Sequence, residues 1–123
     1  MTIRAVVRGV GHYLPDRVVP NAEFEALIDT SDEWIRARSG IERRHFAAEG
    51  QTTSDLATRA AQAALADAGM GADSIDAIIV ATSTPDLTFP SVATMVQGAL
   101  GMTRGFAFDV QAVCAGFAFA LAN

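Results

Sequence analysis

Residues 106–123 read FAFDVQAVCAGFAFALAN, and this stretch decides the fold class. Its first part, FAFDV (106–110), predicts a strand. Its last part, VCAGFAFALAN (113–123), is almost wholly apolar and small, and a helix that is apolar on all sides is buried in a protein interior. The stretch therefore predicts a strand that leads almost directly into a buried helix.

The segments immediately before this stretch alternate between strand and helix in the same way. IDAIIVAT (75–82) is an apolar run with many β-branched residues, which is typical of a buried central strand. Helices are predicted over 54–68 and 91–99, each ending at a glycine. The first of these helices has a face of small residues that permits close packing on a sheet, formed by Leu56, Ala60, Ala64 and Ala68.

The first part of the chain predicts further short elements. They are a strand over 3–10, a helix over 22–28 with Asn21 as its N-cap, a helix over 30–38 capped by Ser31 or Asp32 and followed by Gly40, and a strand over 41–47. Strands that alternate with helices along the whole chain indicate a layered α/β domain.

Length and composition exclude several classes of protein. The chain has 123 residues, of which 50% are hydrophobic, so it is long enough for one domain with a core and is not disordered. One cysteine excludes a disulfide scaffold. No apolar run reaches membrane-spanning length and the N-terminus lacks the apolar stretch of a signal peptide, so we expect a cytoplasmic protein with no membrane partner.

The charged residues point to a small anionic ligand at most. Fourteen acids against nine bases give a net charge of −5, and all nine bases are arginine. An acidic chain argues against nucleic-acid binding. Four arginines nevertheless fall close together, at Arg36, Arg38, Arg43 and Arg44, and could hold one phosphate or carboxylate. The alternative is a solvated charged face.

Cys114 is the candidate nucleophile. It follows the predicted strand over 106–110 and stands at the start of the predicted buried helix, where the helix dipole and free backbone N–H groups favour the thiolate. Small neighbours, Ala112, Ala115 and Gly116, leave room for a substrate. The alternative is an inert buried cysteine.

Several motifs together resemble one family. DVQAVCAGFAFAL (109–121) resembles the nucleophile segment of the thiolase superfamily and, more narrowly, of β-ketoacyl-acyl-carrier-protein synthase III. The other matching stretches, in order, are GVGHYLP (9–15), NAEFEALIDTSDEWIRARSGIERRHFA (21–47), IIVATSTPD (78–86), FPS (89–91) and ALGMT (99–103). The resemblance implies a layered αβαβα fold with a mixed sheet, of which residues 1–123 supply the N-terminal half.

The resemblance also implies roles for individual residues. Cys114 corresponds to the acyl-accepting nucleophile, Trp34 and Arg38 to the pair that sandwiches the adenine of coenzyme A, and Thr30 to a residue lining the coenzyme A tunnel. Phe89 corresponds to a residue that closes the partner's acyl pocket in a homodimer. The flat indole and guanidinium suit a purine, and their i, i+4 spacing places both on one helix face. The alternatives are a core anchor for Trp34, a solvated ion pair for Arg38 and ordinary core for Phe89.

Two groups that the family uses have no counterpart in this chain. They are a histidine and an asparagine that stabilise the enolate and the oxyanion. His12 and His45 match neither position, Asn21 is explained as a cap, and Asn123 is the last residue. Because the chain also stops within an apolar pattern, we expect it to be the N-terminal part of a longer protein and to be inactive on its own.

The implied activity is the start of fatty-acid chains. An acyl group, expected from acetyl-coenzyme A, moves to Cys114 and is then condensed with malonyl-acyl carrier protein, with loss of carbon dioxide. No metal or other cofactor is implied, since coenzyme A thioester is a substrate. Two alternatives stay open: a related condensing enzyme of polyketide or other secondary metabolism, and a non-catalytic half-domain.

Overall fold

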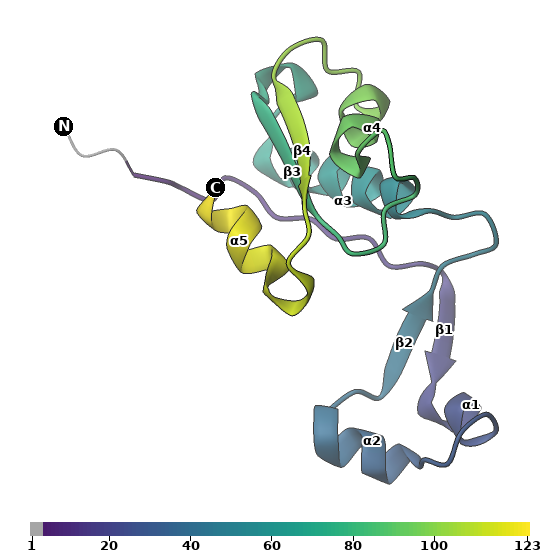
Figure 1. Ribbon diagram of the computed structural model, residues 1–123. Coiled ribbons are helices and arrows are strands. Elements are labelled where there is room, and N and C mark those ends of the chain that lie inside the picture. The colour runs from purple at the N-terminus through teal and green to yellow at the C-terminus, as the bar shows by residue number, and fades with distance from the viewer. Residues whose placement is uncertain (1–3) are drawn as a thin grey trace. The chain divides into compact units, whose positions relative to one another are not determined.

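The computed structural model describes residues 4–123, which form two compact units. The hairpin unit is Leu14–Gln51, and the layered unit comprises the chain up to Tyr13 together with Thr52–Asn123. Each unit contains a two-stranded sheet, antiparallel in the hairpin unit and parallel in the layered unit. Figure 1 shows the elements coloured along the chain.

The hairpin unit pairs two strands and carries two helices. Strand β1 (Arg17–Pro20) pairs with β2 (Arg43–Phe46), and the chain between them forms α1 (Asn21–Glu25) and α2 (Asp32–Ser39). The helix expected over 30–38 and the strand expected over 41–47 are confirmed within two residues at each end. The predicted caps of α2 are confirmed as well: Ser31 Oγ accepts the Trp34 N–H, and Gly40 ends the helix at a left-handed φ of 71°.

Two features of this unit differ from expectation. Strand β1 was not predicted, because four residues gain strand structure only by pairing with a segment more than twenty positions away. The helix expected over 22–28 is shorter, and Asn21 does not cap it: the N-cap is Pro20, and Asn21 is the first helical residue. Its side chain is buried, so the amide bonds to other parts of the unit.

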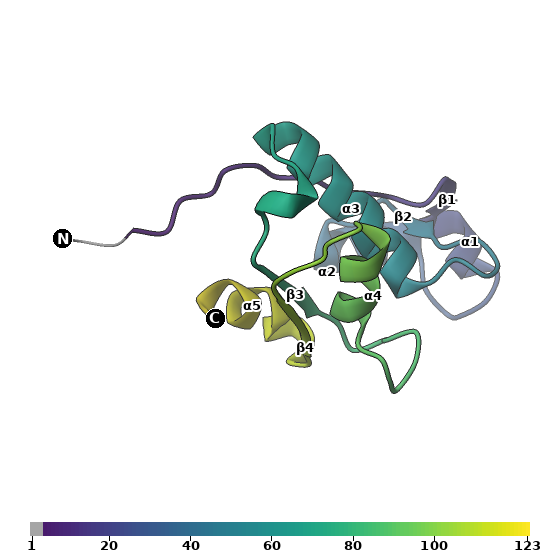
Figure 2. The ribbon, with the colours of Figure 1, turned by 90° about the horizontal axis from the view of Figure 1, so that it is seen from above.

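The layered unit places helices on both sides of a parallel strand pair. Its elements are α3 (Thr53–Ala68), η1 (Ala72–Ser74), β3 (Ala77–Ala81), α4 (Val92–Ala99), β4 (Phe106–Val110), η2 (Val113–Ala115) and α5 (Gly116–Ala122). Strands β3 and β4 pair in parallel, and α3 and α4 lie on one side of them with α5 on the other (Figures 1 and 2). The predicted elements over 54–68, 75–82, 91–99 and 106–110 are confirmed.

Two carboxylates hold the helices α3 and α4 by their N-termini. Asp109, on β4, accepts the N–H groups of Val92 and Ala93 at 2.8 Å each. Asp86, in the loop after β3, accepts the N–H of Ser54 at 2.9 Å and its hydroxyl at 2.6 Å. Both interactions place a negative charge at the positive end of a helix.

Removing the charge of Asp86 gives a testable effect. Burial raises the pKa of its carboxyl, but hydrogen bonds from Ser54 and Thr52 outweigh burial, so the pKa lies below the ordinary 3.8. The stabilisation is therefore present above the unfolded-state pKa and is lost as pH falls through the lower folded-state pKa. We expect Asp86→Asn to cost about 1 kcal/mol of unfolding free energy at pH 7 and less at pH 3. Denaturant titrations at both pH values check this, with the exposed Asp73→Asn as the matched control.

The N-terminal segment lies on the small-residue face of α3. A Cβ at Gly9 would overlap Ala64 and Ala68, and one at Gly11 would overlap the backbone of Ala64, so only glycine permits this approach. The Val10 N–H donates to Asp67 Oδ2 at 2.9 Å. The small-residue face of α3, which was predicted to pack on a sheet, therefore packs against residues 9–11.

The strand expected over 3–10 is not found in residues 4–10, and Ile3 lies outside the described residues. The apolar, β-branched composition of this segment suits a strand, but a strand also needs a hydrogen-bonded neighbour. Within the described part of the chain, the segment pairs with neither β3 nor β4.

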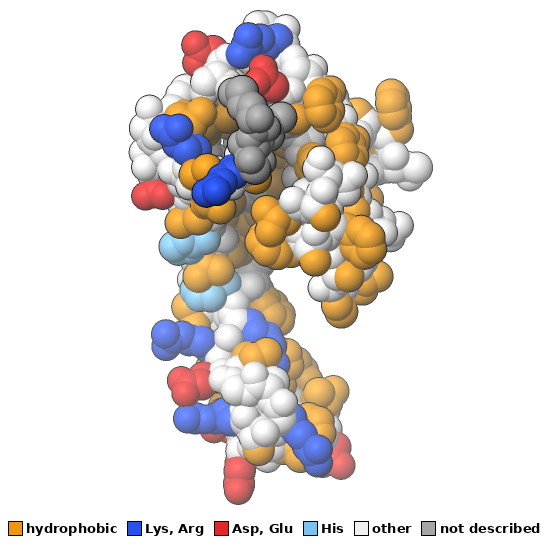
Figure 3. Space-filling view, turned by 90° about the vertical axis from the view of Figure 1, so that its left-hand side faces the viewer, with side chains coloured by type: hydrophobic (Ala, Val, Ile, Leu, Met, Phe, Trp, Pro, Cys, Tyr) orange, Lys and Arg blue, Asp and Glu red, His pale blue; other side chains and the backbone are white. Residues whose placement is uncertain are grey.

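Burial is concentrated between α4 and the sheet. Val92, Ala93 and Val96 of α4 are at most 1% exposed, whereas β3 is only half-buried and not the fully buried strand expected. The apolar helix expected over 113–123 is present as η2 and α5, but Phe117 is 77% exposed and Leu121 is 70% exposed. The helix is not buried, because no described element covers its outer side. Figure 3 shows hydrophobic side chains, in orange, gathered on this side of the molecule.

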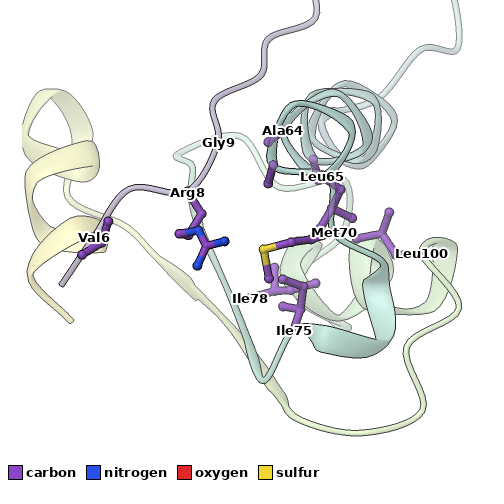
Figure 4. A pocket seen from close by; sticks show the side chains of 11 residues that line it. Val6, Arg8, Gly9, Ala64, Leu65, Met70, Ile75, Ile78 and Leu100 are labelled. Carbon is purple, nitrogen blue, oxygen red and sulfur yellow. The ribbon is translucent and has the colours of Figure 1, made fainter.

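A separate pocket of about 350 Å³ lies beside the N-terminal segment. Its walls are largely apolar and include Leu65, Met70 and Ile78, with Arg8 as the charged residue among its lining (Figure 4). None of the residues that the sequence singles out for chemistry lines it.

The exposed apolar residues of α5 give a second testable expectation. Covering on the order of 300 Å² of apolar surface is worth about 7 kcal/mol, comparable with the whole stability of a small domain. We expect the 123-residue chain on its own to associate and to bind a hydrophobic dye. Sedimentation velocity and dye fluorescence measure this. A monomer that melts sharply and binds no dye would contradict the expectation.

Candidate functional site

Cys114 lies where strand β4 passes into helix α5. It is the middle residue of η2, the single 3₁₀ turn between these elements, so it precedes the helix start by two residues. The thiol is exposed, unlike the inert buried cysteine that was the alternative. A substrate carbonyl can therefore reach the sulfur from solvent.

The backbone around Cys114 is tightly constrained. Val113 adopts a left-handed φ of 47°, which is strained for a β-branched residue, and such strain concentrates at functional sites. On the other side, Gly116 is buried against Ala81 at the end of β3, and a Cβ there would lie 3.1 Å from the Ala81 Cβ. These two positions fix the turn that presents the thiol.

Thr30, Trp34 and Arg38 come together at one end and one face of α2. The Arg38 guanidinium carbon lies 5.7 Å from the centre of the Trp34 ring, which is 57% exposed. Two adjacent hollows flank the indole, one of about 380 Å³ lined by Asp29, Thr30 and Ser31, the other of about 360 Å³ reaching Arg38. The indole is therefore accessible from both hollows, with the Arg38 guanidinium over its ring.

The four clustered arginines divide into two groups. Arg36 pairs with Glu42 at 3.0 Å and with Asp32 at 3.8 Å, and Arg44 donates to Asn21 and lies over the Phe24 ring. Among residues 4–123, by contrast, no acid lies within ion-pair distance of Arg38 or Arg43. Arg38 is therefore available to an external anion, whereas Arg36 and Arg44 are engaged within the unit.

Phe89 is highly exposed, at 85%. It lies in the loop between β3 and α4, immediately before a cis peptide bond to Pro90. Within residues 4–123, Phe89 is therefore not part of the core. Cys114 and Phe89 belong to the layered unit, and the other three predicted residues belong to the hairpin unit.

Sequence analysis missed the polar residues that hold these elements in place. Asn21 was read as a cap, and Asp86 and Asp109 were not singled out. In a sequence, the usual sign of a carboxylate that caps a helix is an acid close to the predicted helix start. Asp109 gives no such sign, because it lies 17 positions after its partner Val92. His45, which matches no catalytic position of the family, is half-buried, and its Nδ1 lies 2.6 Å from the Pro15 carbonyl oxygen.

Two searches within the described residues were negative. No group of three His, Cys, Asp or Glu side chains there is arranged to hold a metal ion. No helix in residues 4–123 has the length and apolar content to cross a membrane.

Curated proteins match the chain along its whole length. β-Ketoacyl-[acyl-carrier-protein] synthase III of Cereibacter sphaeroides is 83% identical over 123 residues, which are 100% of this chain and 38% of that protein. The protein of the same name from Ruegeria pomeroyi is 78% identical over 123 residues, with the same coverage. The chain thus spans 38% of the length of these relatives. No family model matches the chain.

Solved structures agree with the sequence comparison. The crystal structure of 3-oxoacyl-[acyl-carrier-protein] synthase III from Aquifex aeolicus matches with a TM-score of 0.87 at 46% identity, over 93% of this chain and 37% of that one. The priming β-ketosynthase of the R1128 polyketide pathway matches with a TM-score of 0.89 at 37% identity, over 94% of this chain and 35% of that one. The expected thiolase-like α/β fold class is confirmed. Over its whole length, the chain is thus similar in sequence and in fold to part of β-ketoacyl-[acyl-carrier-protein] synthases III.

Proposed function

We propose that this chain supplies the acyl-accepting part of a condensing enzyme that starts fatty-acid chains. The observation that carries the proposal is the exposed Cys114 thiol at the β4–α5 junction, in a chain 83% identical to a β-ketoacyl-[acyl-carrier-protein] synthase III. The intact mass of the protein after incubation with acetyl-coenzyme A tests it, because an acyl group on sulfur adds mass.

The proposed chemistry has two steps at one sulfur. The Cys114 thiolate attacks the thioester carbonyl of acyl-coenzyme A, the bond to the coenzyme A sulfur breaks, and coenzyme A leaves as the free thiol after taking a proton. Malonyl-acyl carrier protein then loses carbon dioxide, and the resulting carbanion attacks the acyl carbon and releases the Cys114 thiolate. The histidine and asparagine that the resemblance assigns to the second step match no residue of this chain.

Coenzyme A is the ligand proposed for the face of α2. Adenine is flat and would lie between the Trp34 indole and the Arg38 guanidinium once these move apart from 5.7 Å, since each stacking contact takes about 3.5 Å. Thr30 would line the adjacent hollow. Because Arg38 has no acidic partner among the described residues, its charge is available to a phosphate.

Phe89 is proposed to act across a homodimer by closing the acyl pocket of the partner. Its 85% exposure supports this, since covering the phenyl ring would remove apolar area from water. We further propose that the enzyme works in the cytoplasm, with acyl-coenzyme A and malonyl-acyl carrier protein as its substrates.

A second candidate is starter selection for a polyketide. The observation that supports this second candidate is the similarity to the priming β-ketosynthase of the R1128 pathway, with a TM-score of 0.89. The same thiol would serve, and only the preferred acyl group would differ. Competing acyl-coenzyme A thioesters of different chain length in one incubation, and comparing the adduct masses, separates the two.

A further inference from the structure

Asn21 is a polar residue at the centre of the hairpin unit, where only 1% of it is exposed. The side chain makes three hydrogen bonds: Nδ2 donates to Asp32 Oδ1 at 2.8 Å and to the Ile41 carbonyl at 2.7 Å, and Oδ1 accepts from Arg44 Nη1 at 2.8 Å. With two acceptors on one side and a guanidinium on the other, the amide can satisfy them in one orientation only.

The partners of Asn21 bracket helix α2. Asp32 is the first residue of this eight-residue helix, and Ile41 follows its C-cap, Gly40. One amide therefore holds the chain at both ends of the helix that carries Trp34 and Arg38. The Arg44 bond ties the same amide to strand β2.

Apolar packing alone provides little to fix this helix. Ile35 is its one buried residue, and Pro15 and Val19 are the other buried apolar residues of the unit. Trp34 is 57% exposed, so packing of its own ring does not set its position. A buried and fully satisfied amide is well suited to do so, because each partner left unpaired would carry a desolvation penalty.

We propose that Asn21 is a positioning residue for the ligand-binding face of α2, and that it sets the affinity for acyl-coenzyme A without touching it; this rests on the proposed function. The amide holds the helix, and the helix holds the indole and the guanidinium side by side, 5.7 Å apart, on one face. A displacement of the order of 1 Å at such a site costs binding measurably.

The test changes the amide to a carboxylate of the same shape. Asn21→Asp turns two hydrogen bonds, to Asp32 and to the Ile41 carbonyl, into contacts between oxygens, and keeps the acceptor for Arg44. We expect the acetyl-coenzyme A concentration that half-saturates acylation of Cys114 to rise about 5–10-fold, with the rate at saturation within about twofold. Gln62→Glu, an amide-to-acid change on the exposed surface of α3, is the matched control and leaves both values unchanged.

A second pair of variants keeps the test decisive if Asn21→Asp does not fold. Asp32→Ala removes the acceptor and is expected to raise the half-saturating concentration, whereas Asp32→Asn keeps it and is expected to recover most of the parent affinity. In Asn21→Asp with Asp32→Asn, one hydrogen bond forms again with its direction reversed, so part of the affinity should return. Equal affinities for Asp32→Ala and Asp32→Asn would overturn the proposal.

A fluorine label separates this inference from the proposed function. The ¹⁹F resonance of 5-fluorotryptophan at position 34, assigned with Trp34→Phe, reports the surroundings of the indole without any ligand. We expect Asn21→Asp to shift or broaden it and Gln62→Glu to leave it in place. An unchanged resonance in Asn21→Asp would refute positioning by Asn21. A shifted resonance together with parent-like coenzyme A binding by Trp34→Ala would instead refute the coenzyme A site.

Discussion

In a longer protein that carries this sequence, replacing Cys114 with serine is expected to abolish the acyl-enzyme adduct and to lower condensation by at least about three orders of magnitude. A serine hydroxyl stays protonated at neutral pH, whereas a thiol is partly ionised and intrinsically more nucleophilic. The substitution changes one atom at an exposed position, so the fold should be unaffected. Intact-mass spectrometry after incubation with acetyl-coenzyme A measures the adduct, and thermal melts of parent and variant check folding.

Two outcomes would contradict the assignment in different ways. An acyl adduct that survives in Cys114→Ser would place the nucleophile elsewhere. A parent protein that forms no adduct, although iodoacetamide alkylates its thiol, would favour the non-catalytic alternative. Running a longer protein that carries this sequence beside the 123-residue chain shows whether the chain alone suffices for acyl transfer.

Removing either stacking face of α2 is expected to weaken binding of coenzyme A. Stacking of a base on an aromatic or guanidinium plane is worth about 1–3 kcal/mol, so Trp34→Ala and Arg38→Ala should each lower affinity by about 10–100-fold. Arg38→Ala also removes a charge that no described acid neutralises, so its effect should shrink at high salt. Titration of the protein with coenzyme A, followed by calorimetry, gives the affinities.

Matched controls are available on the same helix. Trp34→Phe keeps a smaller stacking face and should lose less affinity than Trp34→Ala. Arg36→Ala removes an arginine that is paired with Glu42 and should leave the affinity for coenzyme A close to that of the parent. Unaltered affinity in both Trp34→Ala and Arg38→Ala would show that this face of α2 does not bind the nucleotide.

Local chemistry was enough to predict most elements of the layered unit. Two examples are the strand at 75–82, with its apolar, β-branched run, and the helix at 54–68, with its cap and its face of small residues. Both can be predicted because hydrophobic periodicity and helix caps are properties of neighbouring residues. Cys114 was found for the same reason: it is the single cysteine, between a strand and an apolar segment. The proximity of Trp34 and Arg38 followed from their i, i+4 spacing, and the structure confirms it.

Long-range pairing was beyond such reasoning. The segment over 4–10 has the composition of a strand but forms none, because strand structure depends on a hydrogen-bonded neighbour and not on composition. For the same reason β1 was missed. The helix at the C-terminal end was correctly identified as apolar, but its burial depends on a second layer that residues 4–123 do not contain.

The sequence by itself determined the order of the elements from α2 onward, the α/β class, the nucleophile candidate and the helix face with Trp34 and Arg38. Only the tertiary structure decided what holds them: the Asn21 amide at both ends of α2, Asp86 and Asp109 at the starts of α3 and α4, and the strained turn at Val113. Hydrogen bonds join residues by distance in space, and eleven to thirty-two positions separate these partners in the chain. A pattern of neighbouring residues carries periodicity and charge, but a buried polar contact exists only once the chain has folded back on itself.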